Sequence, residues 1–125
     1  MIAAVAVCPC PPLLVPQVAA GAAPELHDLR AACDRAVAAV LDSGPDVVVL
    51  LGGGDETVAA GPGDSGSFSG LGVDLTVPLG PRLCAGRPLL PLSLTVGAWL
   101  LGRSRWSGDV QGLSVAADTP SADCA

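Results

Sequence analysis

Acidic side chains that directly follow a run of glycines are the best-placed candidates for chemistry in this sequence. Glycine lets a backbone approach a ligand closely, and a carboxylate can serve as an oxygen ligand or as a general base. The segment follows Asp46–Leu51, an apolar run typical of a buried strand, and open α/β sheets bind ligands where such strands end. The alternative is a tight turn with solvated carboxylates. The candidate ligand loop comprises Gly52, Gly53, Gly54, Asp55 and Glu56.

Two cysteines form a second candidate site. Cys8 and Cys10 follow the apolar run Ile2–Cys8, which is typical of a strand buried on both faces. Thiolates bind metals, but a metal site needs further ligands, and the chain offers only Cys33, Cys84, Cys124 and His27 elsewhere. The alternative is that Cys8 is buried and Cys10 partly exposed, without a metal. The odd number of cysteines, with no secretion signal, argues against a disulfide framework.

Two further motifs lie in a glycine-rich segment, 59–70, which we predict to be a loop. Gly63-Asp64-Ser65-Gly66 is similar to the nucleophile segment of chymotrypsin-like serine proteases, but a triad would need His27, the only histidine, which we place on the polar face of a helix. Gly61, Gly63 and Gly66 satisfy the phosphate-binding pattern G-x-G-x-x-G, but they lie ten residues past the preceding strand. We interpret both motifs as loop sequence.

The elements that would position these residues alternate between strand and helix. The clearest helix is Pro24–Asp42, with Leu26, Cys33, Val37 and Leu41 on its apolar face and His27, Arg30, Asp34 and Arg35 on its polar face. A strand, this helix and a second strand within the first 51 residues fit a right-handed βαβ unit. Asp118-Thr119-Pro120 is typical of a helix start. The predicted strands are Ile2–Cys8, Asp46–Leu51, Leu71–Val77 and Val110–Ala117; a short apolar helix spans Leu92–Leu101, with Trp99 in the core, and a loop spans Gly80–Arg87.

The charge balance excludes several classes of protein. Twelve acidic residues oppose six basic ones, all Arg, for a net charge of −6 among 125 residues. Six scattered arginines cannot form the basic patch of a nucleic-acid binder, and a P-loop needs a Lys that the chain lacks. Half of the residues are hydrophobic, which is too apolar for intrinsic disorder. We therefore expect one folded domain without a nucleic-acid partner.

The sequence also predicts no membrane segment. The N-terminus has no positive region of the kind that begins a signal peptide. The longest uncharged apolar stretch, between Arg87 and Arg103, holds 15 residues, whereas a membrane span needs about 20. We expect a cytoplasmic protein.

The stretch Cys8-Pro9-Cys10-Pro11-Pro12-Leu13-Leu14-Val15-Pro16 resembles a motif of LigB-like proteins, the subunit-B-like class III extradiol ring-cleavage dioxygenases, in an alanine-rich actinobacterial branch. Three further stretches agree in style and order: 25–34, 46–57 and 90–100. The resemblance implies an α/β fold with a mostly parallel central sheet flanked by helices. It further implies that the chain is about the N-terminal half of such a domain, truncated at its C-terminus.

The same resemblance implies a non-haem Fe(II) held by two His and one Glu, with open positions for a catechol and O₂. This sequence departs from that pattern. Cys10 stands at the first ligand position in place of a His, the second position falls among glycines 52–54, and the third would lie in the absent half. We therefore expect that the chain alone binds no Fe(II) and cleaves no aromatic ring.

Three hypotheses for function follow. The first is a dioxygenase-family oxidoreductase with residual or no activity, in which Cys10, Asp55 and Glu56 are the best candidates for active-site residues. The second is a non-catalytic structural or interaction module on the same scaffold. The third is a small-ligand domain that uses the glycine loop. Because the last predicted strand lacks a covering helix, we expect a homo-oligomer or a partner subunit to cover the open sheet.

Overall fold

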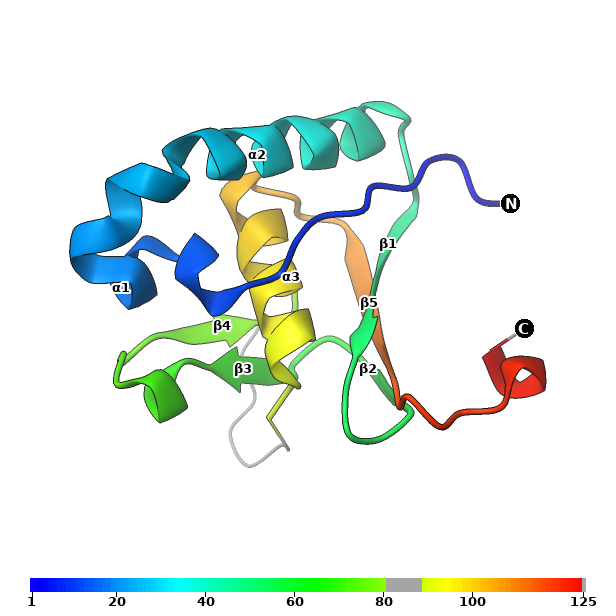
Figure 1. Cartoon of the computed structure of the whole chain (residues 1–125). Coiled ribbons are helices and arrows are strands. Elements are labelled where there is room, and N and C mark those ends of the chain that lie inside the picture. Colours follow the sequence, from blue (N-terminus) through cyan, green and yellow to red (C-terminus); the bar gives the residue numbers. More distant parts are fainter. Residues whose placement is uncertain (81–88, 125) are drawn as a thin grey trace.

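The computed structural model describes residues 1–80 and 89–124 (Figure 1). Four 3₁₀-helices, three α-helices and five strands lie within these ranges. In chain order they are η1 Pro12–Leu14, α1 Pro16–Ala19, η2 Ala20–Leu26, α2 His27–Asp42, β1 Val47–Gly53, β2 Val58–Ala60, β3 Ser65–Ser67, η3 Ser69–Leu71, β4 Thr76–Pro78, α3 Leu92–Arg103, β5 Asp109–Val115 and η4 Ser121–Cys124.

The strands form two small sheets. The larger has the order β1-β5-β2, with β1 parallel and β2 antiparallel to β5, and the smaller is the antiparallel pair β3-β4. Figure 1 shows α3 between the two sheets, with α2 crossing above it. The α/β class is confirmed. The larger sheet of the described part has one parallel and one antiparallel pair and the smaller sheet is antiparallel, so the expected mostly parallel sheet is replaced by small mixed sheets.

The apolar run at the N-terminus does not form the predicted strand. Residues 1–7 are exposed and have no regular secondary structure, and the parallel partner of β1 is β5. The parallel unit of this fold is therefore β1-α3-β5 and not a unit built on Ile2–Cys8 and α2. An apolar sequence favours extended backbone, but pairing also needs a partner edge, which the sequence run does not specify.

Helix α2 was predicted almost to its bounds, but one of its residues was placed on the wrong face. Pro24 lies in η2, directly before the helix. Arg30, expected on the polar face, is only 7% exposed. Its Nε donates to the Leu14 carbonyl oxygen at 2.7 Å and its Nη2 to the Ala23 carbonyl oxygen at 3.0 Å. The buried guanidinium satisfies backbone groups of η1 and η2 that no apolar side chain could satisfy.

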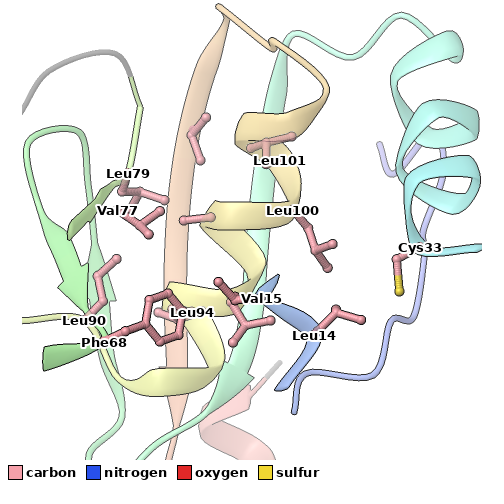
Figure 2. Packing of buried hydrophobic residues seen from close by; sticks show 13 residues of the cluster. Leu14, Val15, Cys33, Phe68, Val77, Leu79, Leu90, Leu94, Leu100 and Leu101 are labelled. Carbon is pink, nitrogen blue, oxygen red and sulfur yellow. The ribbon is translucent and has the colours of Figure 1, made fainter. Parts of the chain in front are cut away.

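The core surrounds α3, which begins after Pro91 as predicted and extends to Arg103. Leu94 and Val96 are buried, and Trp99 packs against the cluster half-buried. Figure 2 shows Phe68 and Leu79, which lie next to β3 and β4 in the chain, facing α3. Leu14, the last residue of η1, and Val15, which follows it, lie on another side of α3. A helix that is apolar on most of its surface must be enclosed in this way.

Strand β1 is buried on one face only, although its apolar sequence predicted burial on both. Val47, Val49 and Leu51 are 38%, 58% and 70% exposed, whereas Val48 and Leu50 are half-buried and pack against the core. The alternation follows from the two-residue period of a strand, because α3 covers one face. The other face of β1 carries exposed aliphatic side chains.

The remaining predictions have mixed outcomes. The segment 59–70 is not a loop throughout, because β2 ends in it and β3 lies within it, and the strand predicted over Leu71–Val77 is reduced to β4. Strand β5 confirms the last predicted strand, and η4 follows Pro120. The loop predicted at Gly80–Arg87 lies outside the described residues except for Gly80. In the part of the chain that is described, no helix is long and apolar enough to cross a membrane.

Candidate functional site

The candidate ligand loop lies where β1 ends, at the carboxyl edge of the parallel pair. The helix α3 begins at the same edge, and its Ser93 hydroxyl donates to the Gly53 carbonyl oxygen. A Cβ on Gly52 would stand 2.5 Å from the Ser93 Oγ, so a side chain at this position would displace the start of α3. Gly52 is therefore needed for the packing of helix on strand.

The rest of this loop is held through its backbone. The Gly54 amide donates to the Val115 carbonyl oxygen at 3.2 Å, and a Cβ on Gly54 would lie 3.1 Å from the Cβ of Ser114. The buried Ser114 hydroxyl donates to the Glu56 carbonyl oxygen at 2.6 Å. The side chains of Asp55 and Glu56 are exposed. Exposed carboxylates are what the alternative of a solvated turn predicts, and the binding of a ligand by this loop stays a prediction.

Two threonines that were not among the candidate site residues close the loop, Thr57 and Thr119. The Thr57 hydroxyl accepts a hydrogen bond from the Ala116 amide at 2.8 Å and is also hydrogen-bonded to the Thr119 hydroxyl. Thr119 belongs to the segment Asp118-Thr119-Pro120, which the sequence predicted as a helix start. In the structure its hydroxyl is hydrogen-bonded to Thr57 at the end of the loop. The pairing itself joins positions far apart in the chain and has no local signal.

The cysteine candidates lie on a different part of the molecule. Cys10 is exposed on the segment that leads into η1, and η1 packs against α1, η2 and α3 rather than against the sheet. Cys8 is half-buried, and Cys33 is buried on α2. Burial, followed by the neighbouring Cys8 and Asp34, raises the pKa of the Cys33 thiol. Cys84 lies outside the described residues.

These residues do not fit the Fe(II) centre that the resemblance implied. Across residues 1–80 and 89–124, no three His, Cys, Asp or Glu side chains form a group that could hold a metal ion. Cys10, Asp55 and Glu56 in particular do not form such a group. A facial triad requires three ligands that converge on one point.

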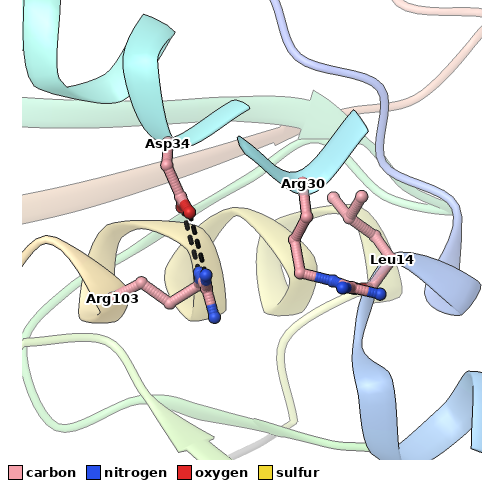
Figure 3. A network of polar contacts seen from close by, with 4 residues as sticks. All are labelled: Leu14, Arg30, Asp34 and Arg103. Carbon is pink, nitrogen blue, oxygen red and sulfur yellow. Dashed lines mark hydrogen bonds and ion pairs between the residues drawn. The ribbon is translucent and has the colours of Figure 1, made fainter. Parts of the chain in front are cut away.

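A polar pair joins the two larger helices. Arg103 of α3 forms a bidentate hydrogen-bonded ion pair with Asp34 of α2, at 3.0 Å from Nε and 2.8 Å from Nη2 (Figure 3). The hydrogen bond from Arg103 lowers the pKa of the Asp34 carboxyl. The same guanidinium lies 4.9 Å from the centre of the Trp99 ring. The other tryptophan, Trp106, donates from Nε1 to the Asp109 carbonyl oxygen at 3.3 Å.

A shallow groove of about 420 Å³ lies between α2 and α3 beside this pair. Val37, Leu41 and Leu100 form its apolar lining, and Asp34 and Arg103 lie within it. Because the two charged side chains neutralise each other, the groove presents no free charge from this pair to a ligand.

The two motifs of the glycine-rich segment serve structural roles. Ser65 is buried in β3 and His27 is exposed at the start of α2, so the exposed histidine is confirmed. A Cβ on Gly66 would lie 1.9 Å from the Thr95 Oγ1 of α3. Gly66 thus allows β3 to approach α3. Because this last glycine of the motif lies within β3, the motif does not open a helix as a phosphate-binding fingerprint does.

Comparisons with protein-family models, with curated proteins and with solved structures found no match to this chain.

Proposed function

We propose that this chain is a non-catalytic structural and interaction module, and that its partner is a second copy of itself that docks along β1. The observation that carries the proposal is the combination of an unpaired edge and an exposed apolar face on one strand. In the sheet order β1-β5-β2, β1 is an edge strand, and no strand among the described residues pairs with its outer edge. Val49 and Leu51 expose more than half of their surface on the face that α3 leaves open.

An edge strand of this kind is a template for pairing with another chain. Natural proteins usually protect such edges with charges, prolines or bulges, and Val47–Gly53 contains neither a charged residue nor a proline. Two copies related by a twofold axis present the same surface to each other, which is the commonest arrangement of soluble oligomers.

The sequence of β1 is self-complementary in an antiparallel pairing. With the twofold axis at Leu50, Val49 of one copy lies opposite Leu51 of the other, and both are on the open face. Aliphatic pairs across two strands stabilise a sheet by about 0.2–1 kcal/mol each. The paired sheets would form one sheet of the order β2-β5-β1-β1-β5-β2, which is within the usual size of a sheet.

Sedimentation equilibrium of the wild-type chain and of Leu51→Lys tests the proposal, because a lysine on an edge strand opposes pairing. The matched control is Leu71→Lys, on η3, where the leucine is also exposed. We expect a dimer for the wild type and for Leu71→Lys, and a folded monomer for Leu51→Lys by circular dichroism. A monomeric wild type, or equal dissociation of both variants, would refute the proposal.

Salt separates self-association from binding of a basic partner. Each copy carries a net charge of −6, so salt that screens the repulsion should strengthen the dimer. Binding to a basic protein would weaken under the same conditions.

The LigB-like resemblance supports a second hypothesis, a dioxygenase-family protein with Fe(II)-dependent ring cleavage. The resemblance rests on the stretch from Cys8 to Pro16, in which Cys10 replaces the first His ligand. Anaerobic purification with Fe(II), followed by measurement of bound iron and of O₂ uptake with a catechol such as protocatechuate, distinguishes the hypotheses. Stoichiometric iron with substrate-dependent uptake would favour the dioxygenase, and neither is expected for the interaction module.

A further inference from the structure

The groove between α2 and α3 carries one negative charge that no cation of the described chain compensates. Figure 3 shows Asp34 and Arg103 paired between the two helices, so together they add no net charge. Asp42, the last residue of α2, also lines the groove. Its side chain is exposed, and no described residue forms a hydrogen bond or an ion pair with its carboxylate.

The place of Asp42 in its helix adds to this negative charge. The C-terminus of a helix carries partial negative charge on its carbonyl groups, and a basic side chain there is stabilising. The last turn of α2 has no basic residue and ends instead in Asp42. The carboxylate and the helix end repel each other, so a cation bound beside Asp42 would interact favourably with both.

The rest of the groove is lined by aliphatic side chains. Val37 and Leu41 come from α2, one turn apart, and Leu100 comes from α3. Leu100 is buried and the other two are half-buried, so they form a fixed apolar wall. The volume of about 420 Å³ lies within the range of small-molecule sites, which is roughly 300–1,000 Å³. A ligand with an aliphatic body and one positive end would match both parts of the groove.

We propose that this groove binds a small aliphatic amine in its ammonium form. The ammonium group lies beside Asp42, and the alkyl chain lies along Val37, Leu41 and Leu100. The ligand must come from another molecule, because the chain has no Lys and a second copy cannot supply an alkylammonium group. No residue that lines the groove belongs to β1, so the site does not depend on the dimer proposed above.

Titration of the whole ¹⁵N-labelled chain with n-hexylamine, followed by two-dimensional NMR of the backbone amides, tests the proposal. The amine is protonated at neutral pH, as a Lys side chain is. Hexanol and hexanoate carry the same alkyl chain with a neutral and a negative end. We expect shifts concentrated in residues 37–42 and 100–104, a millimolar Kd for hexylamine, weaker binding of hexanol and the weakest of hexanoate. Equal affinity for the amine and the alcohol, shifts elsewhere, or no shifts would overturn the proposal.

The variant Asp42→Asn tests the charged end, because it removes the charge and keeps the size of the side chain. Asp28→Asn, at an exposed acidic position in the first turn of the same helix, is the matched control. Since Asp42 is exposed, we expect the Kd of hexylamine to rise about two- to fivefold in Asp42→Asn. It should not change in Asp28→Asn. Equal weakening in both variants would indicate general attraction by an acidic protein and would refute the site.

The variant Ala38→Leu tests the apolar part. Ala38 lines the groove at an exposed position of α2, and leucine is a good helix former, so the variant should fold as the wild type does. The larger side chain should occupy the groove and abolish the shifts caused by hexylamine and by hexanol. Ala39→Leu, at the neighbouring exposed position that does not line the groove, should leave them unchanged. Binding that survives in Ala38→Leu would overturn the proposal.

Discussion

The Nε of Arg30 donates a hydrogen bond to the carbonyl oxygen of Leu14 at 2.7 Å, and both residues are buried (Figure 3). This contact joins α2 to η1, whose Leu14 and the adjacent Val15 are fully buried in the core. A charged side chain thus holds an irregular segment that has few backbone partners of its own.

Replacement of Arg30 should therefore be costly. In Arg30→Met the apolar stem is kept, but the Leu14 and Ala23 carbonyls lose their donor. We expect the free energy of unfolding to fall by about 2–3 kcal/mol, as for a buried hydrogen bond to a charged group. Urea denaturation measures this difference. Arg35→Met, at an exposed position of the same helix, should change the free energy by about 0.5 kcal/mol or less; equal effects would contradict the assigned role.

A methyl group at Gly66 should separate β3 from α3. In Gly66→Ala the new Cβ would lie 1.9 Å from the Oγ1 and 2.6 Å from the Cβ of Thr95, so the helix or the strand must move. We expect a destabilisation of about 1–3 kcal/mol in thermal or urea unfolding.

The control for this overpacking is Gly53→Ala. Gly53 is also a strand glycine, but an added Cβ there would meet no atom within 4 Å. The variant should retain wild-type stability or gain slightly, since alanine restricts the unfolded chain. A loss in Gly53→Ala as large as that in Gly66→Ala would show that the steric contact with Thr95 is not the cause.

The pair Asp34–Arg103 should make stability depend on acidity. The hydrogen bond from Arg103 holds the pKa of Asp34 below its ordinary value of 3.8. A carboxylate whose pKa is lower in the folded state stabilises the fold above the unfolded pKa, and this contribution is lost as the pH falls through the folded pKa.

The measurement is the difference in unfolding free energy between the wild type and Asp34→Asn, from neutral pH down to a pH below the folded pKa of Asp34. Because both side chains are more than a third exposed, solvent screens the pair and we expect less than about 1 kcal/mol near neutral pH. The difference should shrink towards zero in acid. Asp28→Asn, at an exposed position of the same helix, is the control. A difference that does not change with pH would contradict the ion pair.

The Ser114 hydroxyl should hold the candidate ligand loop in place. It is buried and donates to the Glu56 carbonyl oxygen at 2.6 Å. Ser114→Ala leaves that carbonyl without this donor, and we expect a loss of about 1–2 kcal/mol. The hydrogen-exchange rates of the backbone amides of residues 54–58 should rise in the same variant. Ser107→Ala, at an exposed site, should change neither quantity.

The helices were the most predictable part of the fold. In α3 the start after Pro91 and the continuous apolar sequence are local signals, and so is the three- to four-residue spacing of Cys33, Val37 and Leu41 in α2. Strands β1 and β5 were also predicted, although only β1 is a continuous run of aliphatic residues and β5 alternates aliphatic with polar or small residues. The N-terminal run has the same local character, yet it remains unpaired.

The candidate ligand loop lies where the sequence predicted it, at the end of β1, and its role in binding a ligand stays a prediction. The sequence located Gly52 and Gly54 at the end of a strand, as the structure does. It could not show that a Cβ on either would meet a serine side chain, Ser93 or Ser114, from a distant segment. A glycine required for packing and a glycine required for a ligand have the same sequence signal, and only the surrounding atoms distinguish them.

The sequence by itself determined the α/β class, the two long helices and two of the strands, because periodicity, capping and turn residues act over a few positions. The tertiary structure decided which strand pairs with β1, that Arg30 is buried, and that Thr57 is hydrogen-bonded to Thr119. These three outcomes depend on contacts between residues far apart in the chain. Such contacts depend on which side chains of the whole chain are buried together in the core, and no local sequence pattern specifies this.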